Sequence, residues 1–422
     1  RAFELDPDDI PALARLSMTL NLLPGYASGL SRKDYIEKAA PYTKRAYELG
    51  PDHWEANLAK GFELRQRADV DFTDPGVALP YLQRSLELNP SYGTSYAWLA
   101  GLKLRMGDIA GSLRILESAI EIAPLDRILL DNLSGGYIRH GQFEDAQAII
   151  ERLMTVSPYM AHSRAAHLAT AQGRWADNAI ALIQKLAVAP QSSNFWARRI
   201  VGDDLALVTE AFTLGDADSY CGLYALKGQT DEQVQCIQKN METRATKDAD
   251  YFVGVTQAIL GQYEEAYATL EAVWEQIDQS VPIMPTRIHI AVRLAVGDLD
   301  GANELLEQTI EYVESRTEAG IVALTLVRDK GMAYYLVGEK EKAYPLLKKT
   351  VEGGLYIRTF EWYKEEFRND PVIKRMLAMQ DAKTVVERER FLTIMCGPAN
   401  PVPDYWRPSE AACSTIEEQR VN

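Results

Sequence analysis

Glycine and proline recur at one fixed spacing along this chain, and that spacing limits the fold more than any other feature. Pro90, Pro124 and Pro158 follow one another at intervals of 34 residues. Glycines occupy a matching place between and beyond them, at Gly107, Gly141, Gly173, Gly228, Gly261, Gly297 and Gly338. A short period with one breaker in its middle and another at its end leaves room for two helices. The sequence therefore predicts a stack of helical hairpins.

The stretch between Pro124 and Pro158 shows how one hairpin is encoded. Proline ends the preceding helix because it lacks an N–H and fixes its own φ. We expect the next helix over about residues 128–140, followed by Gly141 in the left-handed position that glycine adopts at little cost. The second helix carries an apolar stripe at helical spacing, formed by Phe143, Ala146, Ile149, Ile150 and Leu153.

The pattern resembles the tetratricopeptide (TPR) repeat, in which neither helix buries its stripe alone and hairpins stack on one another. The predicted fold class is all-α, a superhelical solenoid of antiparallel helix pairs. Residues 1–190 are expected to form an array that begins mid-repeat, since Arg1–Pro7 matches the end of a second helix, with a lengthened inter-helix loop at 68–74. The remaining expected parts are an irregular helical insert at 191–215, a second array at 216–353, capping helices at 354–395 and a Pro-rich tail at 396–422.

Charge and motif content argue against nucleic-acid binding and catalysis. Lys and Arg total 45 against 60 Asp and Glu, a net charge of −15, and no basic run resembles a nucleic-acid footprint. No phosphate-loop, dinucleotide-binding, serine-hydrolase or zinc-protease motif occurs, and the histidines are not spaced as metal ligands. We therefore expect no enzyme, no cofactor, no metal and no nucleic-acid partner. No apolar run is long enough to predict membrane insertion by this segment.

The four cysteines fall into two pairs. Cys221 and Cys236 would lie on the two helices of one hairpin, while Cys396 and Cys413 bracket a proline-rich loop. A disulfide across that loop would constrain the unfolded chain by about 3 kcal/mol. Two disulfides would indicate an oxidising compartment such as the periplasm. The alternative is four free thiols in a cytoplasmic protein.

The first helix of each hairpin lines the concave face in superhelices of this kind. The frame set by the glycines places a partner-binding set there: Trp98, Arg105, Asn132, Arg139, Arg164 and His167. Three arginines converging in an acidic protein would suit a carboxylate or an acidic peptide, which guanidinium groups bind in a bidentate manner. The set partly resembles the carboxylate-clamp TPR domains of chaperone adaptors, but the lysines of that clamp have no counterparts here. The alternative is that the arginines pair with Asp and Glu on neighbouring helices.

Three segments resemble the C-terminal periplasmic TPR region of bacterial membrane-anchored TolB-like proteins: Arg1–Asp8, Tyr47–Asn57 and Phe367–Leu377. In that family an adenylate cyclase or winged-helix module and one transmembrane helix precede the repeats. The resemblance implies a scaffold that binds a protein or peptide in the periplasm, with any membrane anchor upstream of Arg1. Two alternatives stay open, a ligand-sensing regulatory domain of a membrane-anchored signalling protein and a structural subunit of an envelope complex.

Overall fold

The computed structural model describes residues 6–23, 32–71, 73–188, 260–275, 287–355, 357, 365–398 and 400–401, with isolated positions at 235, 253–254, 257–258, 408, 410 and 413–414. Within these ranges the chain is helical and contains no strand, which confirms the all-α fold class. The predicted insert at 191–215, together with Gly228, Cys221 and Cys236, lies outside the described residues. None of the helices in the described part is long and apolar enough to cross a bilayer.

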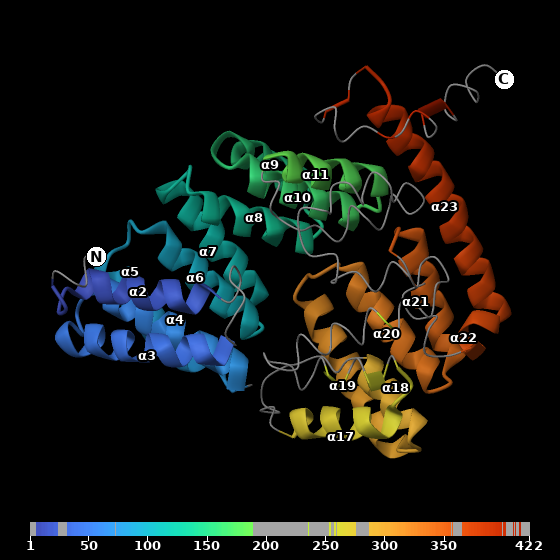
Figure 1. Ribbon diagram of the computed structural model, residues 1–422, viewed down its shortest axis with the longest axis horizontal. Coiled ribbons are helices and arrows are strands. Elements are labelled where there is room, and N and C mark those ends of the chain that lie inside the picture. Colours follow the sequence, from blue (N-terminus) through green and yellow to red (C-terminus); the bar gives the residue numbers. More distant parts are fainter. Residues whose placement is uncertain are drawn as a thin grey trace.

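Antiparallel helix pairs follow one another along the chain (Figure 1). The first array comprises α2 (Ile10–Leu22), α3 (Arg32–Leu49), α4 (Trp54–Asp71), α5 (Leu79–Leu88), α6 (Gly93–Arg105), α7 (Ile109–Ile122), α8 (Arg127–Arg139), α9 (Phe143–Val156), α10 (Pro158–Ala171) and α11 (Trp175–Val188). The second comprises α17 (Tyr263–Trp274), α18 (Arg287–Ala295), α19 (Leu299–Glu318), α20 (Leu324–Leu336) and α21 (Lys340–Glu352), followed by α22 (Glu365–Asn369) and α23 (Pro371–Met395).

The α8–α9 hairpin forms as its sequence predicts. Asp126 begins α8 by accepting hydrogen bonds from the backbone N–H groups of Ile128 and Leu129 at 2.8 and 3.2 Å. Gly141 ends the turn with φ of +72°, and the N–H of Gln142 donates to the carbonyl of Tyr137 at 2.9 Å. A β-carbon at position 141 would therefore be strained, which is the physical reason for glycine there.

Small residues bring the paired helices together. Ala146 of α9 and Ala119 of α7 are both fully buried. A single apolar cluster includes both residues and runs from α6 to α10 without a break. The core is thus continuous from α6 to α10, as expected when each hairpin buries its stripe against its neighbours.

The connection predicted as a loop at 68–74 is partly helical. Helix α4 continues to Asp71, and a short 3-10 helix, η2 (Pro75–Ala78), begins after it. The helix extends because Ala68 is buried at 2% exposure and Asp69 forms an ion pair with Arg105 of α6 at 2.7 Å. The extra length of this repeat is therefore taken up by one more helical turn as well as by a loop.

The second array packs against the first rather than extending away from it (Figure 1). Three hydrogen bonds join helix ends of the first array to the second: Arg316 Nη1 to the Leu104 carbonyl (3.4 Å), the Val322 N–H to the Arg139 carbonyl (3.0 Å) and Trp175 Nε1 to the Gly354 carbonyl (2.6 Å). Helix α23 adds apolar contacts, because Phe391, Leu392 and Met395 pack with α10 and α11 in one cluster. The chain consequently folds back on itself, with α23 bridging both arrays.

Candidate functional site on the concave face

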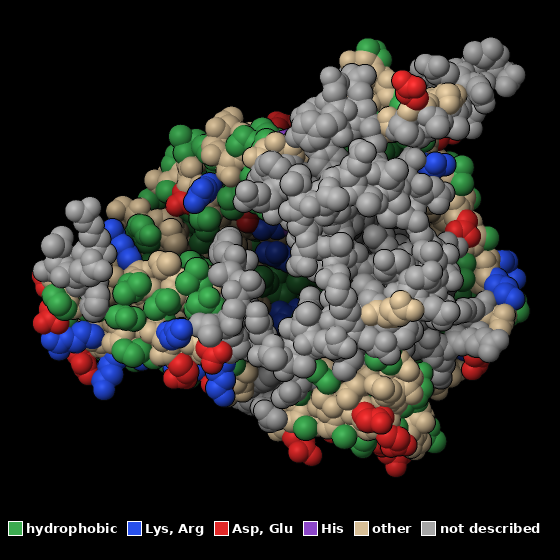
Figure 2. Space-filling model, viewed as in Figure 1, with side chains coloured by type: hydrophobic (Ala, Val, Ile, Leu, Met, Phe, Trp, Pro, Cys, Tyr) green, Lys and Arg blue, Asp and Glu red, His purple; other side chains and the backbone are tan. Residues whose placement is uncertain are grey.

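The first helices of successive hairpins, α4, α6, α8 and α10, each supply an arginine to the concave face. Arg65 comes from α4, Arg105 from α6, Arg139 from α8 and Arg164 from α10. Figure 2 shows a hollow beside the first array with Lys and Arg side chains at its base. A cationic stripe thus occurs inside a molecule whose net charge is −15. Exposure differs along it, since the side chain of Arg164 is 21% exposed and that of Arg105 is 40% exposed.

Two of the three predicted arginines are neutralised by carboxylates of the neighbouring helix. Arg105 contacts Asp69 at 2.7 Å. Arg164 forms a bidentate pair with Asp131, with both N–O distances at 2.6 Å. Each pair joins one hairpin to the next, so these guanidinium groups stabilise the stack.

Arg139 differs from these two arginines because it forms no ion pair within the described part of the chain. Its Nε is buried and has no hydrogen-bond partner there. Burial, followed by the positive charge of Arg164, lowers the pKa of Arg139. Both guanidinium groups approach Gly135, since a β-carbon at that residue would lie 2.8 Å from Arg164 Nη1 and 3.5 Å from Arg139 Nη1. Two guanidinium groups therefore lie close together, and the carboxylate of Asp131 pairs with only one of them, that of Arg164.

This arrangement favours an incoming anion. A guanidinium group that is partly desolvated and next to a like charge is stabilised when a carboxylate supplies the missing charge and acceptors. Glycine at position 135 lets the Arg164 guanidinium group approach α8, since a β-carbon there would lie 2.8 Å from Arg164 Nη1. The described residues contain no group of three or more His, Cys, Asp or Glu placed to bind a metal ion.

The other three predicted residues surround this pair in different ways. Trp98 packs against Phe62 with ring centroids 4.2 Å apart and the rings tilted by 44°, and Arg65 lies over the Trp98 ring at 5.4 Å. The Asn132 side-chain amide donates to the Ile128 carbonyl of its own helix at 2.8 Å, so that donor is used locally.

His167 is exposed on α10. The surrounding protein atoms, together with the positive charges of Arg164 and Lys185, lower its pKa. It is therefore neutral at pH 7 and can donate or accept one hydrogen bond at the edge of the site.

Two residues of the candidate site were not predicted from the sequence. Arg65 was not predicted, although its place on α4 corresponds to the face that Arg105 occupies on α6. Asp131 was not predicted either. The sequence does contain a pattern that could have identified Asp131. Asp131, Gly135 and Arg139 are spaced four residues apart, which puts all three on one side of α8.

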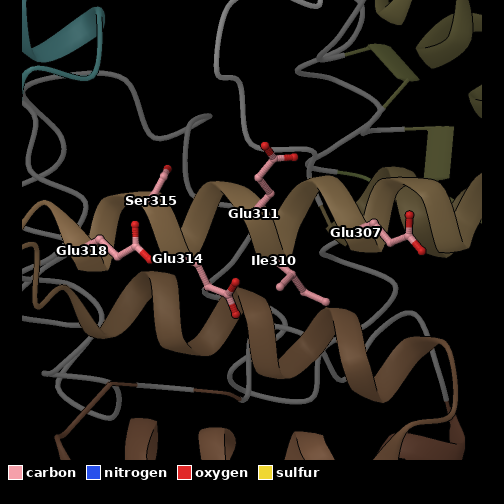
Figure 3. Close-up of a pocket in the computed structure, with 6 residues that line it drawn as sticks. All are labelled: Glu307, Ile310, Glu311, Glu314, Ser315 and Glu318. Carbon is pink, nitrogen blue, oxygen red and sulfur yellow. The ribbon is translucent and has the colours of Figure 1, made fainter.

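An acid-lined hollow of about 430 Å³ lies on α19 (Figure 3). It is lined by Glu307, Ile310, Glu311, Glu314, Ser315 and Glu318, all from this helix. Glu314 forms an ion pair with Lys330 at 2.7 Å. The hollow would repel an acidic ligand, so the concave arginines are the better location for one.

No family model matches the chain. It is 27% identical over 223 residues to the Cellulose synthase 2 operon protein C of Komagataeibacter xylinus, a match that covers 47% of this chain and 16% of that protein. The chain thus corresponds to a small part of that curated relative.

Similar solved structures include the human IFIT1 dimer with PPP-AAAA, at 14% identity and a TM-score of 0.38, covering 75% of this chain and 68% of that one. A tetratricopeptide repeat protein from Parabacteroides merdae is similar at 15% identity and a TM-score of 0.25, covering 78% and 98%. The hairpins of this chain have a 34-residue period, glycine turns with positive φ and an apolar core that is shared by α6 to α10. These are features of the tetratricopeptide repeat. The described part of the chain is thus an all-α array of antiparallel helix hairpins that resembles the tetratricopeptide repeat.

Proposed function

We propose that this chain is a non-catalytic scaffold whose concave face binds an acidic segment of a protein or peptide partner. The contact would centre on Arg139 and Arg164, with a carboxylate of the partner accepting hydrogen bonds from the Arg139 guanidinium group. The observation that carries the proposal is the state of Arg139, which is desolvated, adjacent to a like charge and without an ion-pair partner among the described residues. A purely structural arginine would be expected to pair as Arg105 and Arg164 do.

The compartment proposed for this function is the periplasm. Cys396 and Cys413 form a disulfide, with their Cα atoms 5.6 Å apart. Disulfides persist in oxidising compartments and are rare in the reducing cytosol. The disulfide supports a non-reducing compartment, and the resemblance to periplasmic TPR regions supports the periplasm in particular. Tethering to the inner membrane by sequence upstream of Arg1 is part of the same proposal.

The binding site is tested with acidic peptides and matched arginine variants. Fluorescein-labelled peptides rich in Glu and Asp, with a free or an amidated C-terminus, are titrated against wild-type protein and against Arg139→Gln. Loss of a charge-assisted contact is expected to weaken binding about tenfold or more. Arg114→Gln is the control because Arg114 is an exposed arginine on the second helix of a hairpin, α7. It should bind as the wild type does.

A stability measurement separates a binding role from a structural one. Arg139 lacks an ion-pair partner in the described part of the chain, so Arg139→Gln should unfold at the same denaturant concentration as the wild type or slightly above it. Unchanged affinity in Arg139→Gln would contradict the groove proposal. It would favour the structural-subunit alternative, in which partners contact other faces of the array.

A further inference from the structure

Helix α23 carries an apolar stripe on the side that faces away from both arrays. The residues of the stripe and its two ends are all exposed: Arg375, Ala378, Met379, Ala382, Val385, Val386 and Glu389. Val385 and Val386 are 66% and 62% exposed, and Met379 is 43% exposed. Figure 1 shows α23 along the outer edge of the molecule. Large apolar side chains this exposed on one helix indicate a contact surface.

The stripe lies on the side of α23 opposite to the side that is buried against the chain. Arg375, Ala382 and Glu389 lie seven residues apart, and at 3.6 residues per turn they form a nearly straight line along the helix. The other four stripe residues lie on either side of that line. The opposite side holds Ile373, Met376, Leu377, Gln380 and Phe391, which are buried against the rest of the chain.

We infer that this face binds a second copy of the chain, with the two α23 helices antiparallel about a two-fold axis at Ala382. In that arrangement Met379 of one copy meets Val386 of the other, and Ala378 meets Val385. The first pair joins two large apolar side chains, the second places a small one beside a larger one, and Ala382 meets its own copy at the axis. Small residues at the crossing point let two helices approach closely.

Charge at the ends of the stripe selects the antiparallel arrangement. Two-fold antiparallel pairing brings Glu389 of one copy to Arg375 and Lys374 of the other, so opposite charges meet at both ends. Parallel pairing would place each of these residues against its own copy, which sets like charges together. Arg390, which also lies near this end, is already neutralised by Asp177 at 2.7 Å. The apolar centre favours association, and the ends fix its direction.

The proposed dimer interface is small, so the dimer is expected to be weak. The stripe from Arg375 to Glu389 spans about 21 Å at 1.5 Å per residue. One helix pair of this length lies at the lower end of the interface areas found in specific complexes. The dimer should therefore dissociate on dilution instead of persisting at all concentrations.

Sedimentation velocity over a hundredfold range of concentration tests the pairing. The wild-type chain should shift from monomer to dimer as concentration rises. Val386→Glu should remain monomeric, because it places a charge in the apolar centre. Val77→Glu is the matched control, since Val77 is an exposed valine of the first array at 51% exposure, and it should dimerise normally.

A charge reversal tests the direction of the helices. Arg375→Glu and Glu389→Arg should each weaken the dimer, and the double variant should recover it, because antiparallel pairing restores opposite charges across the interface. A wild-type chain that stays monomeric throughout the range would overturn the inference. So would a Val386→Glu chain that still dimerises, or a double variant that does not recover. Circular dichroism of each variant confirms that the exposed substitutions leave the helices intact.

Discussion

At the scale of single residues, Asp370 shows how one buried carboxylate holds the end of an array. It begins α23 by accepting hydrogen bonds from the backbone N–H groups of Val372 and Ile373 at 2.8 and 3.3 Å. Its other oxygen accepts from the hydroxyl of Tyr344 at 2.7 Å and from that of Tyr335 at 3.2 Å. The segment containing Asp370 is among those that suggested the family resemblance, and the structure gives a physical reason for an Asp-Pro pair here.

Replacing Asp370 by alanine is expected to lower the free energy of unfolding by about 2–4 kcal/mol, because it leaves a helix start and two tyrosine hydroxyls without their acceptor. Asp300→Asn is the control, since Asp300 is an exposed aspartate in the first turn of α19. Urea denaturation followed by circular dichroism measures both variants. Equal midpoints for the two variants would contradict the role assigned to Asp370.

The same carboxylate predicts a pH dependence. Burial alone would raise the pKa of Asp370, but hydrogen bonds from Tyr344, Val372, Ile373 and Lys340 outweigh it and lower the pKa to about 2. A lowered folded-state pKa stabilises the fold above the unfolded-state value, and that stability is lost as the pH falls. The difference in unfolding free energy between wild type and Asp370→Ala should therefore narrow by roughly 2 kcal/mol between about pH 4 and pH 2. A difference that stays constant across this range would count against the assignment.

The sequence predicts the position of each arginine in the candidate site but not its ion-pair partner. Helical spacing is enough to place Arg105, Arg139 and Arg164 on first helices of successive hairpins. Which of them is neutralised depends on contacts between hairpins, such as that of Arg164 with Asp131. Such contacts are set by superhelical packing, which a single sequence does not specify. The unusual state of Arg139 is therefore visible only in the structure.

At the scale of elements, α23 is the helix that departs most from a repeat. It contains 25 residues, against 14 in each helix of the α10–α11 hairpin, and it contacts both arrays. Near its C-terminal end, Glu387 accepts a hydrogen bond from the backbone N–H of Ala176 at 2.7 Å. An N–H group in the first turn of a helix is normally satisfied by a capping residue next to it in sequence. In α11 a residue 211 positions away, Glu387, accepts this hydrogen bond.

Substituting Glu387 by alanine is expected to loosen the start of α11 while leaving α10 unchanged. The lost cap should cost about 1 kcal/mol and should speed hydrogen exchange in the first turn of α11. Glu341→Ala serves as the control because Glu341 is an exposed glutamate in the first turn of α21. Faster exchange along all of the first array, or none in α11, would show that Glu387 does not act as this cap.

The elements themselves were largely predictable, and the exceptions have specific causes. The predicted helix at about 128–140 agrees with α8 to within one residue, since a proline and a glycine bound it. The end of α4 was placed too early, because an Asp and a Pro near it suggested a loop. Burial of Ala68 and the Asp69–Arg105 ion pair extend the helix instead. Tertiary contacts there outweigh local propensity.

At the scale of the whole molecule, the fold-back of the two arrays could not be predicted. Its hydrogen bonds join residues such as Trp175 and Gly354, which lie 179 positions apart. Periodicity reports only which residues face the neighbouring hairpin, and each array satisfies that requirement by itself. The contact depends instead on the shape of the turns, where Gly173 and Gly354 allow the two backbones to approach closely.

Two glycines with the same backbone conformation test this fold-back. Gly173 and Gly338 have φ of +65° and +89°, so alanine at either position costs about 1–2 kcal/mol in strain. At Gly173 the added carbon would also lie 2.6 Å from the carbonyl oxygen of Gly353, whereas at Gly338 nothing lies within 4 Å.

Gly173→Ala should therefore separate the arrays and increase the radius of gyration measured by small-angle scattering, while Gly338→Ala should not. Equal radii for the two variants and the wild type would mean that this contact does not hold the arrays together.

The most direct test of the proposed function is to locate the bound ligand. Hydrogen exchange of the wild-type chain is measured with and without a saturating acidic peptide. Binding at Arg139 and Arg164 predicts slower exchange in the C-terminal half of α8 and in α10, with α7 and α9 on the other side of the hairpins unchanged. Protection confined to α7 and α9, or no protection in the first array at a concentration where the peptide is bound, would contradict the concave-face account.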